Sequence, residues 1–211
     1  MQLTKLGHSC VRLAKDGGTL VIDPGAWSGP DVLAGAQAVL VTHEHADHLD
    51  PDALRAAMAA DSSLELWSAA PVTAKFAEFG DRAHAVAPGD AFTAAGFDVW
   101  VSGGQHAKII EQIPVIPNVC FTVDGRVFHP GDSFTRPAAP VDVLLVPVSA
   151  PWLKFSEAAD YIAAAGARRG YAIHDAILAP NGLGLIGNLL TAVSPADRPV
   201  TRLEPGTTVD V

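Results

Sequence analysis

The first part of the chain alternates short apolar runs with polar turns, a pattern typical of β-strands. Residues 3–6 and 10–13 are such runs, and Asp16-Gly17-Gly18 turns the chain into a third run at residues 19–22. Residues 38–41 (Ala-Val-Leu-Val) are apolar throughout, so we expect this strand to be buried on both faces. The pattern predicts hairpins followed by a buried strand.

After the histidine-rich segment that follows residues 38–41, helix-capping residues and helical spacing of apolar residues predict helices. Asp50 suits an N-cap and Pro51 the first helical position, and apolar residues follow at helical spacing. Residues 64–67 predict a strand and residues 71–79 a second helix.

The second half repeats this mixture of strands and helices. A helix is expected from a cap at Ser156-Glu157 to about residue 165, where Gly166 would stop it. The expected strands, with a hairpin around Asp124-Gly125, are 97–102, 118–123, 126–129, 141–146 and 171–173. Two sheets with helices outside both fit this order, which makes the fold class α/β. A length of 211 residues suits a single domain, residues 1–211.

Composition and charge narrow the class of partner. Hydrophobic residues make up 49% of the chain and charged residues 18%, as in folded globular proteins. The net charge of -9 argues against nucleic acid as a partner, and no apolar segment is long enough to predict a membrane partner. The first residues do not resemble a signal peptide. With two cysteines, Cys10 and Cys120, both inside apolar runs, we expect core thiols and a cytoplasmic protein.

The segment after the run at 38–41 carries the strongest chemical signal. His43, His45, Asp47 and His48 place three imidazoles and a carboxylate within six residues. Burying such side chains is costly unless a partner compensates them, and a metal ion does so, because imidazole and carboxylate are good metal ligands. The alternative, a solvated loop, requires three of the 8 histidines to gather here by chance. The spacing therefore predicts a metal site.

This string resembles the H-x-H-x-D-H signature of the metallo-β-lactamase superfamily, and the resemblance extends over nearly the whole chain. Four further positions match in the family's order, each at an expected strand end: Asp23, His106, Asp132 and His174. The resemblance implies a four-layer αββα sandwich of the metallo-β-lactamase type.

The resemblance also implies a dinuclear centre. His43, His45 and His106 would hold the first metal, Asp47, His48 and His174 the second, with Asp132 bridging both and Asp23 supporting the histidine loop from behind. Read alone, His106 is also compatible with a loop histidine, Asp132 with a turn residue in Pro-Gly-Asp-Ser, and His174 with a core or surface residue.

Three other histidines complete the set. His8 lies in Gly7-His8-Ser9, a segment that resembles the ascorbate-6-phosphate lactonase-like and phospholipase D-like hydrolases. We expect it to support the metal site or line the pocket, with a purely structural role left open. His84 and His129 show no ligand spacing and are interpreted as structural.

The implied activity is hydrolysis of a small-molecule ester, lactone or phosphodiester. Two divalent ions would serve it, Zn²⁺ first, with Mn²⁺ or Fe²⁺ as alternatives, and Asp47 and Asp132 would be the catalytic carboxylates. Diiron oxygen-reducing members of the superfamily carry glutamate where His45 stands, so hydrolysis is favoured over redox chemistry. A mononuclear sulfur dioxygenase or glyoxalase-like enzyme, and a metal-binding protein without turnover, remain as alternatives.

Three segments with apolar or aromatic residues follow the ligand loops and could line the mouth of the site: 26–28, 109–116 and 150–155. They predict a small-molecule substrate, although Trp27 and Trp152 also suit an ordinary core. The apolar segment 182–190 predicts a helix against the core or a dimer contact, so a homo-oligomer is left open.

Overall fold

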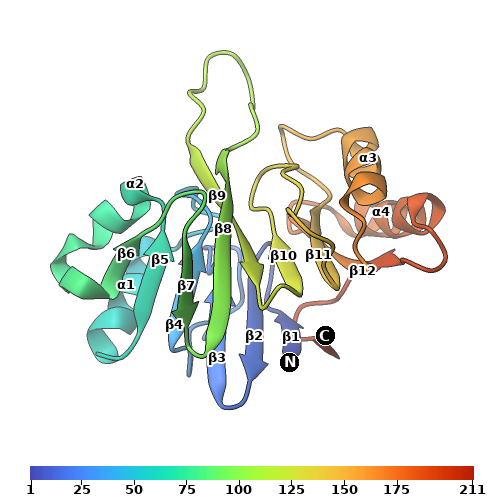
Figure 1. Cartoon of the computed structure of the whole chain (residues 1–211). Helices are drawn as coiled ribbons and strands as arrows, with labels where there is room; N and C mark the ends of the chain where they lie inside the picture. The colour runs from blue at the N-terminus through green and yellow to red at the C-terminus, as the bar shows by residue number, and fades with distance from the viewer.

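A computed structural model describes residues 1–211 as two seven-stranded β-sheets packed face to face (Figure 1). The first sheet contains, in spatial order, β14 (Thr208–Asp210), β1 (Gln2–Lys5), β2 (Val11–Lys15), β3 (Gly18–Ile22), β4 (Ala38–Val41), β5 (Glu65–Ser68) and β6 (Ala83–Ala85). The second contains β13 (Val200–Thr201), β12 (Arg169–Ile173), β11 (Val143–Pro147), β10 (Val127–His129), β9 (Pro117–Val123), β8 (Phe97–Gln105) and β7 (Ala91–Ala94). The C-terminal strand pairs with β1, so the two ends of the chain lie side by side.

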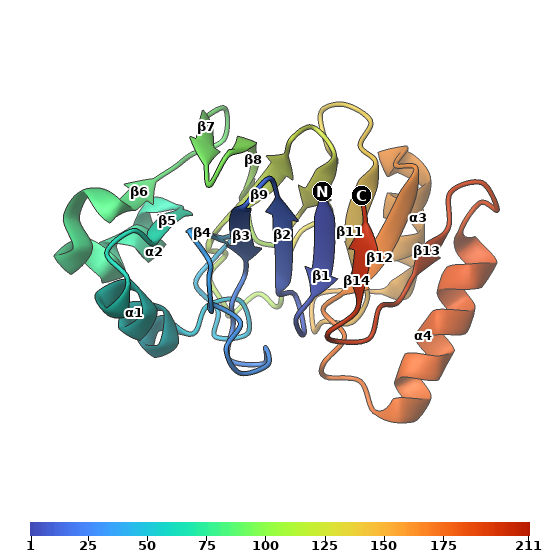
Figure 2. The same cartoon turned by 90° about the horizontal axis from the view of Figure 1, so that it is seen from below.

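Helices cover the outer face of each sheet (Figure 2). Helix α1 (Pro51–Ala60), the short α2 (Ala70–Thr73) and the 3₁₀ helix η1 (Ala74–Arg82) lie beside the first sheet, and α3 (Phe155–Ala165) and α4 (Pro180–Val193) beside the second. The largest core cluster, 22 buried residues, draws on both sheets and fills the space between them. The expected four-layer αββα sandwich is therefore confirmed.

Burial explains the unbroken apolar strand predicted at residues 38–41. All four residues of β4 are buried, because alternate side chains meet different cores. Leu40 packs between the sheets, whereas Val39 and Val41 pack with α1 and η1. This central strand leads directly into the histidine-rich loop.

Most local predictions are confirmed, and two need correction. Asp50 caps α1, with its carboxylate accepting from the backbone N–H groups of Asp52 and Ala53. The helix predicted at 71–79 is instead a short α-helix followed from Ala74 by a 3₁₀ helix, within which the backbone leaves helical geometry at Phe76. The N-cap of α3 is Lys154, two residues before the predicted Ser156, whereas Glu157 does cap the helix by accepting from the Lys154 backbone N–H at 2.9 Å.

The apolar segment 182–190 forms most of α4, whose Ile186 and Leu190 are buried against the second sheet. Its Leu185 is exposed, so a dimer contact stays a prediction. None of the helices has the length and apolar character that a membrane crossing requires.

Candidate metal centre

The candidate ligands lie in loops that follow strands, where the fold brings them to one place. The histidine-rich loop follows β4, His106 follows β8, Asp132 follows β10 and His174 follows β12. These strands belong to both sheets, so each sheet contributes side chains to the same site.

The side chains gather in two groups, and within each group the nearest nitrogen and oxygen atoms lie within 4.8 Å of one another. The first group is His43, His45, His106 and Asp132. The second is His8, Asp47, His48 and His174. The structure thus brings together all seven ligands expected from the sequence and places His8 among them.

Three histidines are oriented by an oxygen behind each ring. The Nδ1 atoms of His48, His106 and His174 donate to Asp23 Oδ2 at 2.6 Å, to the Ala107 carbonyl at 2.5 Å and to the Ser149 carbonyl at 2.5 Å. In the neutral ring each Nε2 atom is therefore left with a lone pair that faces the site, as a metal-ligating histidine requires.

Asp132 lies where these lone pairs converge. Its carboxylate is 2.9 Å from His48 Nε2, 3.2 Å from His106 Nε2 and 3.1 Å from His174 Nε2. The three Nε2 atoms and Asp132 Oδ1 are buried, and although they lie at ion-pair distance from the site's own charged groups, none has a well-aligned hydrogen-bond partner. Unpaired buried polar atoms are costly, and a cation among them removes that cost. The residues present therefore fit a metal ion, and imidazole with carboxylate suits zinc, manganese or iron.

In the first group, too, histidine nitrogen atoms with free lone pairs lie close together. His43 Nδ1 lies 3.0 Å from the Thr42 hydroxyl, which itself donates to Asp23 Oδ2, so His43 Nε2 is left for the site. His43 Nε2 and His45 Nδ1 are 3.1 Å apart. A shared cation would satisfy both nitrogens, and His45 would then act through Nδ1.

Asp23 supports this loop from behind. It is fully buried and accepts from the Thr42 backbone N–H at 2.7 Å, from the Thr42 hydroxyl at 2.8 Å and from His48 Nδ1. A carboxylate behind a ligating histidine fixes both its tautomer and the direction of its ring. The structure thus places Asp23 where the sequence predicted it.

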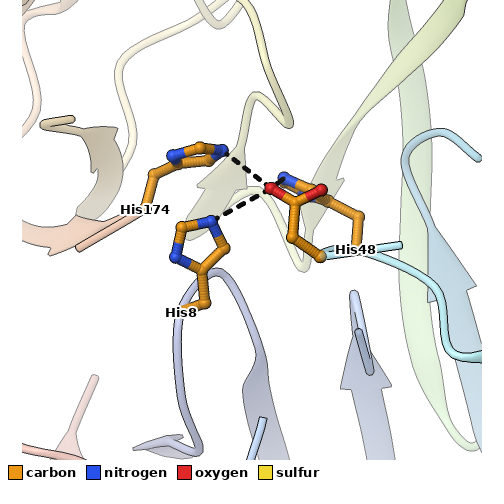
Figure 3. A group of neighbouring side chains, drawn as sticks. His8, His48 and His174 are labelled. Atoms are coloured by element: carbon orange, nitrogen blue, oxygen red, sulfur yellow. Dashed lines mark hydrogen bonds and ion pairs between the residues drawn. The ribbon is translucent and has the colours of Figure 1, made fainter. Parts of the chain in front are cut away.

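Unlike the three histidines that donate through Nδ1, His8 carries its proton on the other ring nitrogen. Its Nδ1 accepts from the backbone N–H of Ala176 at 3.1 Å, so the proton of the neutral ring is on Nε2. That N–H lies 3.2 Å from Asp47 Oδ2 (Figure 3). Although His8 sits among the second group, it presents a donor to Asp47 and no free lone pair to a metal. It therefore supports Asp47, as expected for a residue behind the ligands.

The carboxylates of the site favour positive charge on the histidines around them, as the pKa shifts show. Burial opposes a charge on His174, but the carboxylates of Asp132 and Asp47 raise the pKa of His174 to about 9. Burial also opposes ionisation of Asp132, yet His48 above all holds the pKa of Asp132 well below its usual value. Because ligands must lose such protons to bind a metal, metal binding here would be coupled to proton release.

Asn118 is a site residue that sequence reasoning missed. Its Nδ2 donates to the Pro130 carbonyl at 2.9 Å and its Oδ1 accepts from the Asp132 backbone N–H at 3.0 Å. It thereby fixes the loop that carries Asp132. An asparagine at the start of a strand gives no sequence signal of this role.

The remaining candidates lie outside the two groups. His84 stacks on Trp67 and pairs with Glu65, and the fully buried His129 lies 2.9 Å from the Ser9 carbonyl. Both cysteines are buried and unpaired, and burial raises the pKa of Cys10 to about 12 and that of Cys120 to about 11. They are core thiols, as predicted.

Two tryptophans lie beside the site. Trp27 is 49% exposed, and its ring lies 4.9 Å from that of His8. Trp152 is partly buried, with its ring 6.1 Å from His106 and 6.4 Å from His174. Neither is an ordinary core aromatic. The third segment, 109–116, exposes Ile110, Ile113 and Val115.

Known proteins share both the sequence pattern and the fold. A family model described as the beta-lactamase superfamily domain matches residues 2–174. Protein Rv0786c of Mycobacterium tuberculosis is 42% identical over 204 residues, covering 93% of this chain and 94% of that protein. Igni18, a metallo hydrolase of Ignicoccus hospitalis, has a TM-score of 0.74 at 20% identity, covering 99% of this chain and 97% of its own. YhfI of Bacillus subtilis, a metallo-beta-lactamase fold protein, has a TM-score of 0.73 at 18% identity, covering 99% and 98%. This chain therefore belongs to the beta-lactamase superfamily.

Proposed function

We propose that this enzyme is a dinuclear metal-dependent hydrolase that cleaves an ester, lactone or phosphodiester bond in a small molecule. The observation that carries the proposal is the convergence of buried, unpaired histidine Nε2 atoms on the Asp132 carboxylate. The proposed ligands are His43, His45 and His106 for one ion, Asp47, His48 and His174 for the other, and Asp132 for both. Zn²⁺ is the expected metal, with Mn²⁺ or Fe²⁺ compatible with the same ligands.

When bound, two such ions polarise the bond to be cleaved and lower the pKa of the attacking water. The two carboxylates then have different tasks. The Asp132 side chain is 4% exposed and contacts histidines of both groups. It is therefore placed to take part in proton transfer at the point where the two groups meet. The Asp47 side chain is 16% exposed and is held at Oδ2 by His8, so it can orient the attacking water.

The segment around His8 favours the ascorbate-6-phosphate lactonase-like or phospholipase D-like subgroup within this proposal. Gly7 approaches the backbone of Ser28 so closely that a Cβ on it would lie 2.7 Å from Ser28 Cα. The close approach seats His8 beside Asp47. A histidine that supports a ligand carboxylate is a specific structural role for the Gly-His-Ser segment, which supports lactones and phosphodiesters as substrates to test first.

Hydrolysis of model substrates tests the proposal. Protein purified without chelator should hydrolyse p-nitrophenyl acetate, bis-p-nitrophenyl phosphate or a simple lactone, and lose the activity on chelation. D132A should lose it as well, whereas H84A, which changes a histidine outside the two groups, should retain it. A metal-loaded protein inactive on all three substrate classes, or equal activity of D132A and wild type, would contradict the proposal.

Three alternatives predict different results. A sulfur dioxygenase or glyoxalase-like enzyme would hold one ion and either consume oxygen with a persulfide or cleave a glutathione thioester. A metal-binding protein without turnover would hold its ions and cleave nothing. Nucleic-acid cleavage predicts RNA binding that weakens with salt, and the net charge of -9 argues against it.

A further inference from the structure

Trp152 makes a direct polar contact with Asp132, the more buried of the two carboxylates among the proposed ligands. It lies in the loop between β11 and α3, and its indole Nε1–H donates to Asp132 Oδ2 at 2.8 Å. The ring is held in place by Phe134, at 5.3 Å between centroids, and Phe134 in turn packs on Tyr161 at 5.2 Å. Edge-on and tilted aromatic contacts thus hold this N–H group in its direction.

The indole differs from every other group around Asp132. The three nearby histidines can hold a proton or give it up, and they would turn their lone pairs to a metal. The indole N–H of Trp152 only donates, so it can satisfy one lone pair of Asp132 Oδ2 whatever the state of the histidines. Since Asn118 holds the backbone N–H of Asp132, the residue is fixed at both its main chain and its carboxylate.

We propose that Trp152 is a positioning residue, which holds the Asp132 carboxylate in the orientation that faces both ligand groups. Its hydrogen bond determines which lone pairs of the carboxylate remain for metal ions. The effect on metal binding rests on the function proposed above, whereas the hydrogen bond exists in the protein without ions. Groups behind metal ligands typically change metal affinity or activity by about 10- to 100-fold when removed.

Trp100 provides a matched control. It lies on β8 outside the two ligand groups and is 46% exposed. Its indole makes no hydrogen bond with a candidate ligand in the structure. Replacing either tryptophan with phenylalanine keeps an aromatic ring and removes the N–H, but only W152F removes a contact with Asp132.

The test compares zinc affinity, measured by competition with a chromophoric chelator, and the absorption spectrum of cobalt bound in place of zinc. W152F should bind zinc about 10- to 100-fold more weakly than wild type and show an altered cobalt spectrum. W100F should keep both within twofold of wild type. Wild-type affinity and spectrum in a folded W152F would overturn the proposal.

A second measurement does not depend on W152F folding or on metal binding. The protein has four tryptophans and so four indole N–H signals in a nitrogen–proton correlation spectrum. In metal-free protein, D132A should move the Trp152 signal far more than the other three. Four signals unchanged by D132A would refute the hydrogen bond. If wild type bound no ion but D132A moved this signal, the hydrolase proposal would fail and the positioning contact would stand.

Discussion

A buried lysine behind the metal centre gives the sharpest test of how the fold holds the site. Lys5, on β1, is 1% exposed, and its ammonium donates to Asp175 Oδ1 at 3.0 Å and to the Ala172 carbonyl at 2.9 Å. Arg202 Nε reaches Asp175 Oδ2 at 2.7 Å. Two cations from opposite ends of the chain therefore hold Asp175 in place. Asp175 follows His174, whose backbone is left-handed with a φ of 63°.

The perturbation is K5M, which keeps an apolar stem of similar length and removes the charge. Breaking a buried ion pair by removing one partner costs about 3–5 kcal/mol of unfolding free energy. Because Arg202 still compensates Asp175, we expect the lower end, about 3 kcal/mol. For a chain of this size, that loss lowers Tm by about 6–12 °C.

The assay is urea unfolding followed by circular dichroism, with the free energy of unfolding compared at constant pH and metal content. The matched control is R126M, which breaks the ion pair of Arg126 with Asp142 on the surface. Exposed pairs contribute about 0–1 kcal/mol, so R126M should change little. A loss below about 1 kcal/mol in K5M, or equal losses in the two variants, would refute the view that this buried pair holds the site.

Three further predictions concern the loops and the metal-free protein. G25A should lose metal in a mass-spectrometric count, because a Cβ at Gly25 would lie 1.9 Å from the Asp47 carbonyl oxygen; retention of wild-type metal content would contradict this. D23A removes the acceptor of His48 Nδ1 and should weaken zinc binding about 10- to 100-fold in a chelator competition, with unchanged affinity as the opposing result. In chelated protein the pKa of His174 is raised to about 9 from an ordinary 6.5, so the stability it contributes is full below pH 6.5 and is lost as the pH rises through 9. Urea midpoints of chelated protein should therefore fall over that range, and less in H174Q; parallel profiles for the two proteins would count against it.

The fold was predictable where strands are buried and not where they lie at the edges. The strands that the sequence pattern missed are β6, β7, β13 and β14, and these are the four edge strands of the two sheets. An edge strand pairs on one side only and here spans two to four residues, so it carries little apolar signal. Central strands such as β4 must be apolar because both of their faces are covered.

The site was predictable to the level of residue type and no further. Spacing identified His43 to His48 because four ligand-type side chains in one short loop are hard to explain otherwise. The atoms that orient the rings were hidden, since the acceptors behind His106 and His174 are backbone carbonyls, which every residue carries. Asn118 and Trp152 were equally invisible as partners of Asp132, because their contacts arise only when distant strands meet.

The number of metal ions per chain tests the central claim most directly. Mass spectrometry on protein purified without chelator should find about two ions per chain, as a dinuclear hydrolase requires. D132A should hold fewer, because Asp132 contacts histidines of both groups, and H84A should match wild type. One ion per chain, or none after reloading with zinc, manganese and iron, would contradict the dinuclear centre.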